Sequence, residues 1–461
     1  MNTPSDTIAA IATTPGPSGI AIIRISGPQS LDIADKLFDG TPPAPSKRLG
    51  NTFIYGHIHS PAPQKGLENN DLDEVILLIY RAPHSYTRED TVEIQTHGGS
   101  VCARKILAAV LSAGARPAEP GEFTKRAFLN GRIDLLQAEA VADIIRARSD
   151  RAAAAALEQL KGGLSSVFSS TYDNLLNITA NLEAALDFPD DELPQPVIPD
   201  VLARLKSVIA TLTSQLSTWN EGHLLREGAL VVISGKPNSG KSTLMNHLLG
   251  TDRAIVTDTP GTTRDFIEEQ IVLDGIPLRL IDTAGLRSAK STIEQAGVRI
   301  AQEQISKADL HLHVIDASQA AKRNPGLPAD LTNSNTIIVL NKIDLGQKLH
   351  TSHFPEYTAV SVSLLTDRNI PSILSALSTH LHTNETAAPH AVISERHRST
   401  VHNVLNELNA GTELLSSLEE QTIALSAVHL KNALEQLGAI TGRTYDENLL
   451  SAIFSKFCVG K

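Results

Sequence analysis

The stretch that most constrains this chain is Gly235-Lys-Pro-Asn-Ser-Gly-Lys-Ser242. It follows the apolar run 230–233 and precedes residues 243–249, whose apolar positions have helical spacing. A glycine loop between a strand and a helix wraps backbone N–H groups around nucleotide phosphates, and the positive end of the helix dipole faces them. The pattern predicts a phosphate loop in which Lys241 reaches the outer phosphates and Ser242 offers its hydroxyl to Mg²⁺.

The composition limits the kind of protein that contains this loop. The chain has 461 residues, 41% hydrophobic and 20% charged, which is enough for several globular domains. No apolar run approaches the ~20 residues of a membrane span, and residues 1–6 lack the features of a signal peptide. Two distant cysteines, Cys102 and Cys458, favour a reducing compartment. We therefore expect a cytoplasmic protein without disulfides or a membrane span.

The net charge is −11, from 40 lysines and arginines against 51 aspartates and glutamates. Tight nonspecific binding of nucleic acid depends on neutralising phosphates with basic side chains, which this balance does not favour. We expect any contact with nucleic acid to be local or shared with a partner.

Changes in sequence pattern divide the chain into parts. Residues 1–122 alternate short strands and helices, which predicts a compact α+β domain. Residues 123–222 have helical spacing with a break at a group of prolines that ends with Pro199, and residues 385–461 are helical again. Between them, residues 223–384 alternate strands with helices. The predicted fold is a multidomain α/β protein in which a discontinuous helical domain contains an inserted P-loop domain.

The inserted part is expected to form a mostly parallel sheet. Asp274-Gly275 reads as a hairpin turn, so one pair of strands should be antiparallel. The expected strands are residues 230–233, 267–273, 276–281, 310–315, 336–340 and 357–361.

Asn341-Lys-Ile-Asp344 follows one of these strands. The Asp344 carboxylate can accept hydrogen bonds from N1–H and the 2-amino group of guanine, whereas adenine offers neither donor. Downstream of a phosphate loop, this motif predicts selectivity for guanine. Ser363 follows the next strand, and its loop is expected to contact the base from the far side.

Asp282-Thr-Ala-Gly285 ends another expected strand, where Asp282 would hold Mg²⁺ through water and the Gly285 N–H would sense the terminal phosphate. A threonine of Gly261-Thr-Thr-Arg-Asp265 would complete the Mg²⁺ shell. The order of these motifs is typical of a Ras-like GTPase domain of the translation-factor type.

The residue after the Asp-Thr-Ala-Gly segment is Leu286, where Ras-like enzymes place the glutamine that orients water. A hydrophobic side chain cannot orient water, so another device is required. Asn238 and the segment 257–262 suggest a monovalent cation beside the β- and γ-phosphates, held by an asparagine oxygen and backbone carbonyls. Its charge would replace that of an arginine finger. Asn238 could instead cap the loop.

Separated stretches outside these motifs carry a family resemblance. They are Asp6-Thr-Ile-Ala-Ala-Ile-Ala-Thr13 with residues 19–27, Gly121-Glu-Phe-Thr-Lys-Arg-Ala-Phe-Leu-Asn-Gly-Arg-Ile-Asp-Leu135, and Phe457-Cys-Val-Gly-Lys461. With the GTPase motifs, they make the chain resemble the MnmE (TrmE) family of tRNA modification GTPases over essentially its whole length.

The resemblance implies an N-terminal tetrahydrofolate-binding domain that also forms a homodimer, a helical domain and an inserted GTPase domain. It implies an FAD-dependent partner, MnmG (GidA), in a heterotetramer or larger assembly. Together they would modify carbon 5 of the wobble uridine (position 34) of certain tRNAs to a (carboxymethyl)aminomethyl group. The one-carbon unit would come from 5-formyl- or 5,10-methylene-tetrahydrofolate, and GTP hydrolysis would depend on K⁺ and Mg²⁺.

The resemblance also implies site residues. Folate would contact Arg24, Glu93, Lys125 and Lys461. Mg²⁺ would be held by Ser242 and Thr263, and K⁺ by Asn238, Thr257, Thr259 and Thr262. Glu294 would position the attacking water and form the catalytic set with Lys241 and Asn238. The GTP contacts would be Asn238, Ser239, Gly240, Lys241, Ser242, Thr243, Thr257, Thr262, Thr263, Asp282, Thr283, Ala284, Gly285, Asn341, Lys342, Asp344 and Ser363.

Other functions stay open at this point. One is a different assembly GTPase, such as a ribosome-biogenesis factor with vestigial folate motifs. Another is a nucleotide-switched scaffold with no direct part in tRNA chemistry. Cys458 could be a nucleophile near the one-carbon carrier or a partly buried structural thiol, so we leave it outside the catalytic set.

Overall fold

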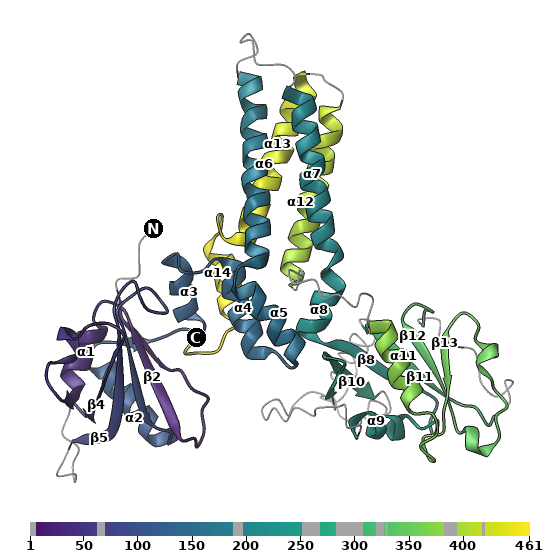
Figure 1. Ribbon diagram of the computed structural model, residues 1–461, viewed down its shortest axis with the longest axis horizontal. Helices are drawn as coiled ribbons and strands as arrows, with labels where there is room; N and C mark the ends of the chain where they lie inside the picture. Colours follow the sequence, from purple (N-terminus) through teal and green to yellow (C-terminus); the bar gives the residue numbers. More distant parts are fainter. Residues whose placement is uncertain are drawn as a thin grey trace, which may run out of the picture. The chain divides into compact units, whose positions relative to one another are not determined.

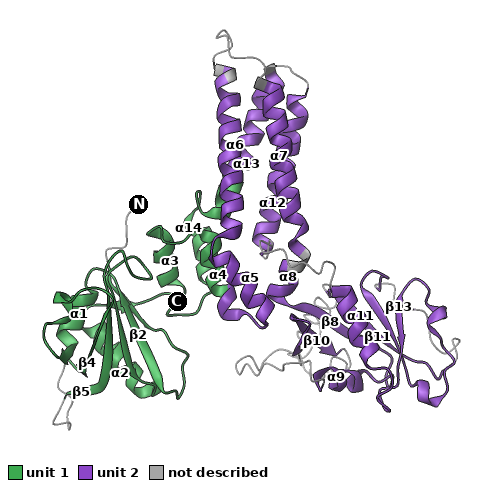
Figure 2. Ribbon diagram, viewed as in Figure 1, with its two compact units in different colours: residues 1–142, 435–461 green, residues 143–434 purple. Residues whose placement is uncertain are grey.

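The computed structural model describes residues 6–61, 70–187, 197–250, 268–282, 308–319, 327, 331–381, 394–416 and 420–461. The chain divides into two compact units, residues 1–142 with 435–461 and residues 143–434 (Figures 1 and 2). No helix in the described ranges is long and apolar enough to cross a membrane. The finer division into domains at residues 122, 222 and 384 stays a prediction.

The first unit contains a seven-stranded sheet with the order β3-β4-β5-β6-β2-β1-β7. Helices α1 (Ser30–Leu37) and α2 (Ser100–Ser112) bury alternate apolar residues of this sheet, such as Ile23 and Ile25. The predicted α+β architecture is therefore confirmed. The strands are β1 (Ile8–Ile11), β2 (Ile20–Ser26), β3 (Phe38–Gly40), β4 (Thr52–His59), β5 (Asp71–Tyr80), β6 (Thr91–His97) and β7 (Arg116–Pro117).

Strand β4 was not predicted from the sequence, because the prolines and glycines around it favour a loop. Its apolar residues nevertheless alternate. Ile54 and Ile58 are buried, whereas Phe53 and Tyr55 are 74% and 58% exposed. Tyr55 pairs across the strands with Ile76, which is also exposed. We call Phe53, Tyr55 and Ile76 the open face of this sheet.

Helix α3 (Glu122–Leu129) packs against the C-terminal helix α14 (Glu447–Phe454). Gly121 precedes α3 with φ of +68°, and a Cβ added there would lie 2.8 Å from the Phe454 carbonyl oxygen. The Gly121 N–H donates to the Cys458 carbonyl at 3.3 Å. These contacts place the end of the chain beside the start of α3, which carries Lys125.

A buried ion cluster fixes α3 to the segment 81–90. Arg126 is fully buried, and its guanidinium lies 3.1 Å from Glu89 and 3.0 Å from Glu122. Burial alone would raise the pKa of Glu122, but hydrogen bonds from Arg116 and Arg126 outweigh it and lower the pKa. Because a buried cation without partners is costly, this cluster holds the segment 81–90 in place.

The second unit combines long helices with an α/β part. Helix α7 packs against α6 and α12, which lie on opposite sides of the α/β part in the sequence (Figure 1). The helical domain is therefore discontinuous, as predicted. Pro199 does not end a helix; it lies in the first turn of α7, where backbone N–H groups need no intrahelical partner. The helices are α5 (Asp150–Leu160), α6 (Gly163–Asp187), α7 (Val197–Ser217), α8 (Trp219–Glu227), α12 (Glu395–Leu415) and α13 (Glu420–Thr441), with α4 (Leu135–Arg146) preceding them.

The α/β part is a six-stranded sheet with the order β13-β12-β11-β8-β10-β9. The β9–β10 pair is antiparallel through Asp274-Gly275, and the other pairs are parallel, as predicted. Helices α9 (Lys241–Leu249) and α11 (Pro371–Leu381) pack on the apolar core of this sheet. The strands are β8 (Ala229–Gly235), β9 (Glu268–Leu273), β10 (Ile276–Asp282), β11 (Leu310–Asp316), β12 (Thr336–Asn341) and β13 (Thr358–Ser361).

The carboxyl ends of the parallel strands meet at one edge of this sheet. Asp282 pairs with Ile233 of β8, and Asp316 of β11 pairs with Asn341 of β12. In open α/β sheets, ligands bind at this edge. The edge thus brings together segments that the sequence keeps far apart.

Candidate functional site

The loop between β8 and α9 has the backbone geometry of an anion cradle. Gly235 has φ of +140° and Gly240 has φ of +105°. A Cβ added at Gly240 would lie 2.2 Å from Asn341 Nδ2, so only glycine fits there. Helix α9 begins with Gly240 as its N-cap and without a side-chain cap, so its first N–H groups suit a bound anion.

Lys241 and Ser239 are buried inside this loop. Lys241 Nζ donates to the Lys236 carbonyl at 3.0 Å, which holds the ammonium across the loop. In the described part of the chain, the buried Ser239 Oγ has no hydrogen-bond partner. A phosphate oxygen would satisfy it, since buried hydroxyls are normally paired. Asn238 is exposed and has a left-handed backbone, with φ of +60°.

Ser242 joins α9 to the end of β10. Its Oγ donates to Asp282 Oδ2 at 3.0 Å. A hydroxyl and a carboxylate are the kind of oxygen ligands that Mg²⁺ takes, directly or through water. The pair predicted from the sequence therefore lies together and suits this ion.

The predicted base-recognition residues are tied to the phosphate loop. Asn341 Nδ2 donates to the Ser239 carbonyl at 2.8 Å, and its Oδ1 accepts from the Leu364 N–H at 3.1 Å. Ser363 Oγ donates to Asp344 Oδ1 at 2.6 Å. The carboxylate expected to select guanine is therefore oriented by the loop that follows β13.

Sequence reasoning missed Asp316 at the end of β11. Lys342, whose backbone is left-handed with φ of +67°, pairs through Nζ with Asp316 Oδ2 at 2.9 Å. Burial would raise the pKa of Asp316, but hydrogen bonds from Ser318 and Lys342 outweigh it and lower the pKa. The only signal in the sequence was its place just after the strand expected at 310–315.

The remaining predicted nucleotide residues cannot be placed. They lie outside the described residues and stay predictions: Thr257, Thr259, Thr262, Thr263, Thr283, Ala284, Gly285, Leu286 and Glu294. Thr243 is described, and it lies exposed in the first turn of α9. The described part of the site thus comprises the phosphate loop, the Ser242–Asp282 pair and the base segments.

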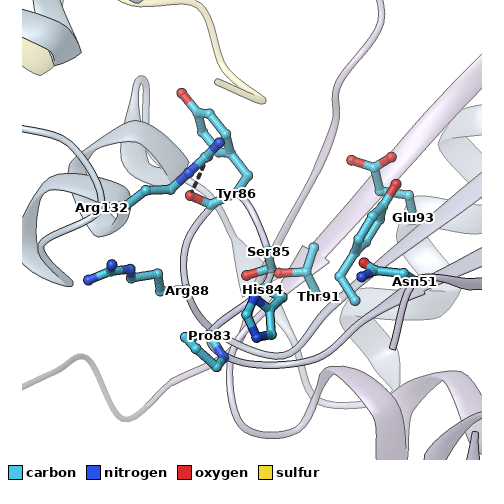
Figure 3. Close-up of a pocket in the computed structure, with 10 residues that line it drawn as sticks. Asn51, Pro83, His84, Ser85, Tyr86, Arg88, Thr91, Glu93 and Arg132 are labelled. Atoms are coloured by element: carbon cyan, nitrogen blue, oxygen red, sulfur yellow. Dashed lines mark hydrogen bonds between the residues drawn. The ribbon is translucent and has the colours of Figure 1, made fainter. Parts of the chain in front are cut away.

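The first unit contains a pocket of about 540 Å³ beside β5, β6 and the segment 81–90. Figure 3 shows Arg88 and Arg132 on one side of it and Glu93 with Asn51 on the other. The lining combines cationic, anionic and aromatic groups and is made of Asn51, Tyr80, Pro83, His84, Ser85, Tyr86, Arg88, Thr91, Glu93 and Arg132.

Two predicted folate residues form an ion pair, and one of them, Glu93, lines this pocket. Arg24 Nε lies 2.7 Å from Glu93 Oε1, and their side chains are 17% and 14% exposed. The Arg24 guanidinium lies 5.4 Å from the Tyr86 ring centroid, within the range of a cation–π contact. Lys125 lies half-buried on α3 and Lys461 half-buried at the chain end, and the structure gives neither a hydrogen bond nor an ion pair with Arg24 or Glu93.

Sequence reasoning also missed the aromatic wall of the pocket. Arg132 donates to the Tyr86 carbonyl at 2.8 Å, and its guanidinium lies 4.8 Å from the Tyr86 ring centroid. Burial raises the pKa of the Tyr80 phenol, and nearby Glu93 adds to the rise. Arg132 lies within the stretch 121–135 that carried the family resemblance, which was the available signal.

Both cysteines are free thiols. Cys458 is exposed, which does not fit the partly buried structural thiol that the sequence left open as one of two alternatives. Its role as a nucleophile stays a hypothesis.

Comparison with known proteins decides the family. Residues 7–132 match the N-terminal family of the GTP-binding protein TrmE, and residues 135–458 match the MnmE helical domain. The chain is 40% identical over 466 residues to the tRNA modification GTPase MnmE of Alkaliphilus oremlandii (strain OhILAs), with 99% of each chain covered. The chain belongs to the MnmE family. The protein of the same name from Thermoanaerobacter pseudethanolicus (strain ATCC 33223 / 39E) is 40% identical over 464 residues, again with 99% of each chain covered.

Membership of the MnmE family and the nucleotide motifs make this chain a GTP hydrolase. The multidomain fold with an inserted P-loop domain is likewise confirmed. Among solved structures, the G domain of the FeoB iron transporter of T. maritima is 23% identical. That alignment covers 33% of this chain and 98% of the FeoB chain, with a TM-score of 0.24.

Proposed function

We propose that this chain is the GTPase component of a complex that modifies the wobble uridine (position 34) of certain tRNAs at carbon 5. The product would be a (carboxymethyl)aminomethyl group. The observation that carries the proposal is 40% identity over 99% of both chains with a protein named tRNA modification GTPase. The FAD-dependent MnmG (GidA) protein would be the partner, in a heterotetramer or larger assembly. Since tRNA is the proposed substrate, we place this assembly in the cytoplasm.

The residues of the second unit would bind and orient GTP. Lys241 and the start of α9 would hold the phosphates, and Asp344 with Ser363 would select guanine. Ser242 and Thr263 would hold Mg²⁺. Asn238, Thr257, Thr259 and Thr262 would hold K⁺. When bound, these cations supply positive charge for the charge that develops during γ-phosphoryl transfer to water. Glu294 would order the attacking water.

The pocket of the first unit supports a folate ligand. A pterin ring presents hydrogen-bond donors and acceptors along one edge, which suits a guanidinium–carboxylate pair such as Arg24 and Glu93. The anionic glutamate tail of 5-formyl- or 5,10-methylene-tetrahydrofolate would be attracted by Arg132, Lys125 and Lys461. A pocket beside such a pair favours a folate-binding enzyme over the two other functions that the sequence left open. These were a ribosome-biogenesis factor with vestigial folate motifs and a nucleotide-switched scaffold.

The open face supports a homodimer through the N-terminal domain. Phe53 and Tyr55 stand largely exposed on a sheet whose other face is covered by α1 and α2. Aromatic side chains exposed together on a sheet are typical of protein interfaces. A second copy of the chain would cover them.

Arg24→Ala is expected to weaken binding of 5-formyl-tetrahydrofolate about 10- to 100-fold, because a hydrogen bond to a charged group contributes about 1.5–3 kcal/mol. Isothermal titration calorimetry of the full-length chain measures this. Arg104→Ala is the matched control, since Arg104 is an exposed arginine on α2 outside the pocket. If the wild type gives no heat of binding with 5-formyl-tetrahydrofolate, the folate assignment is wrong. If Arg24→Ala binds with unchanged affinity, Arg24 is not part of the folate site.

A further inference from the structure

His247 ties the phosphate-loop helix to the loop that follows β13. We call residues 363–369 the base loop. His247 lies on α9, and its Nε2 is 2.7 Å from the Leu364 carbonyl oxygen. Since a carbonyl only accepts, the proton lies on Nε2 and His247 donates. None of the nucleotide motifs includes this histidine.

The same nitrogen lies 3.5 Å from Asp367 Oδ1, which is a longer and weaker contact. The Asp367 side chain is 76% exposed, and an ion pair so open to solvent contributes little. The hydrogen bond to Leu364 is therefore the contact that matters. This hydrogen bond needs only a donor at Nε2.

The Leu364 peptide is held from both sides. Its N–H donates to Asn341 Oδ1 at 3.1 Å, and its carbonyl accepts from His247. Leu364 is itself buried, at 3% exposure. The preceding residue, Ser363, is bonded to the backbone of Arg368 in both directions at 3.0 Å. The base loop is thus closed on itself and fastened to the core at Leu364.

This fastening reaches the residue that selects the base. Ser363 Oγ donates to Asp344 Oδ1 at 2.6 Å, so the carboxylate follows the position of the base loop. At the other end, α9 begins with Lys241, which lies in the phosphate loop. His247 therefore links the half of the site that holds phosphates to the half that reads the base.

We propose that His247 is a positioning residue for guanine recognition. It holds the base loop so that Ser363 keeps the Asp344 carboxylate turned toward the N1–H and 2-amino groups of guanine. This inference rests on the proposed guanine site and adds to it a residue that acts through the loop rather than on the nucleotide.

The test compares His247→Ala with His247→Gln in the full-length chain, using a fluorescent GDP displaced by GDP or by IDP. Inosine lacks the 2-amino group, so the GDP/IDP affinity ratio reports the Asp344 contact directly. His247→Ala is expected to release GDP about 3- to 10-fold faster and to lower the GDP/IDP ratio by a similar factor. His247→Gln is expected to restore the ratio, because its amide can donate to the same carbonyl.

Controls separate this role from a general loss of stability. Asn246→Ala changes an exposed neighbour on α9 and should leave the ratio unchanged. His247→Leu keeps apolar volume without a donor, so it serves if His247→Ala does not fold, and it should lower the ratio in the same way.

The outcomes separate failure of this inference from failure of the proposed guanine site on which it rests. A wild type that binds GDP and IDP equally would overturn the proposed guanine site itself. A wild type that prefers GDP, with an unchanged ratio in His247→Ala and His247→Leu, would overturn the role of His247 alone. Equal weakening of GDP and IDP without rescue by glutamine would show a merely structural histidine and overturn the inference as well.

Discussion

Asp344→Asn is expected to weaken GTP binding by about 100- to 10,000-fold. The variant loses the carboxylate that would accept from N1–H and the 2-amino group of guanine, and each hydrogen bond to a charged group contributes about 1.5–3 kcal/mol. The asparagine amide would instead donate to the 2-oxo group of xanthine. The same variant should therefore gain affinity for xanthosine triphosphate.

Titration of the wild type and the variant with both triphosphates measures this exchange. Ser363→Ala is the graded comparison, because Ser363 Oγ donates to Asp344 Oδ1 at 2.6 Å and orients the carboxylate that remains in this variant, so its loss should cost far less. Gained xanthosine binding would show that Asp344→Asn is folded, so lost GTP binding could not be attributed to unfolding. Undiminished GTP affinity in Asp344→Asn would contradict the assignment of this edge of the sheet as the base site.

Replacing KCl with NaCl is expected to slow GTP hydrolysis by about 100- to 1,000-fold. Removing one group that stabilises developing charge in a transition state slows an enzymatic reaction by about this factor. The physical reason is the hydrophobic Leu286 at the position of the water-orienting glutamine, which leaves an added cation to stabilise the developing charge. The measurement is a steady-state GTPase assay at high protein concentration in each salt.

Asn238→Ala should lose most of the stimulation by potassium while GDP still binds. Asn238 is exposed in a left-handed conformation within the phosphate loop, and it is the proposed side-chain ligand of the ion. Equal rates of GTP hydrolysis by the wild type in KCl and NaCl would contradict the proposal that potassium assists the reaction. Full stimulation by potassium in Asn238→Ala would show that residues other than Asn238 hold the ion.

The α/β sheet was predictable from the sequence because its strands are short buried runs between recognisable turns. The strand expected at 336–340 is β12, Thr336–Asn341, and the Asp274-Gly275 turn joins β9 to β10 as predicted. The glycine loop and the Asn341–Asp344 motif follow strands whose direction is fixed by the fold. Their meeting at one sheet edge could therefore be argued before any coordinates.

The remaining features depend on residues that meet only in space. The His247–Leu364 contact spans 117 positions, and the Arg24–Glu93 pair spans 69. No local pattern marks a histidine on a helix as a donor to a distant carbonyl. In the same way, Tyr86 looks like an ordinary loop residue until Arg24 and Arg132 are found beside its ring. Motifs predicted the chemistry of the site, whereas packing determines how its parts are held.

The central claim, that GTP hydrolysis by this chain serves modification of the tRNA wobble uridine, has one direct measurement. Mass spectrometry of nucleosides from tRNA would compare a strain lacking the gene with strains that carry the wild type or Lys241→Ala. We expect carbon 5 of the wobble uridine to be modified only with the wild type, because Lys241→Ala removes the ammonium that would hold the phosphates. A normal wobble-uridine mass in the strain without the gene would contradict the claim.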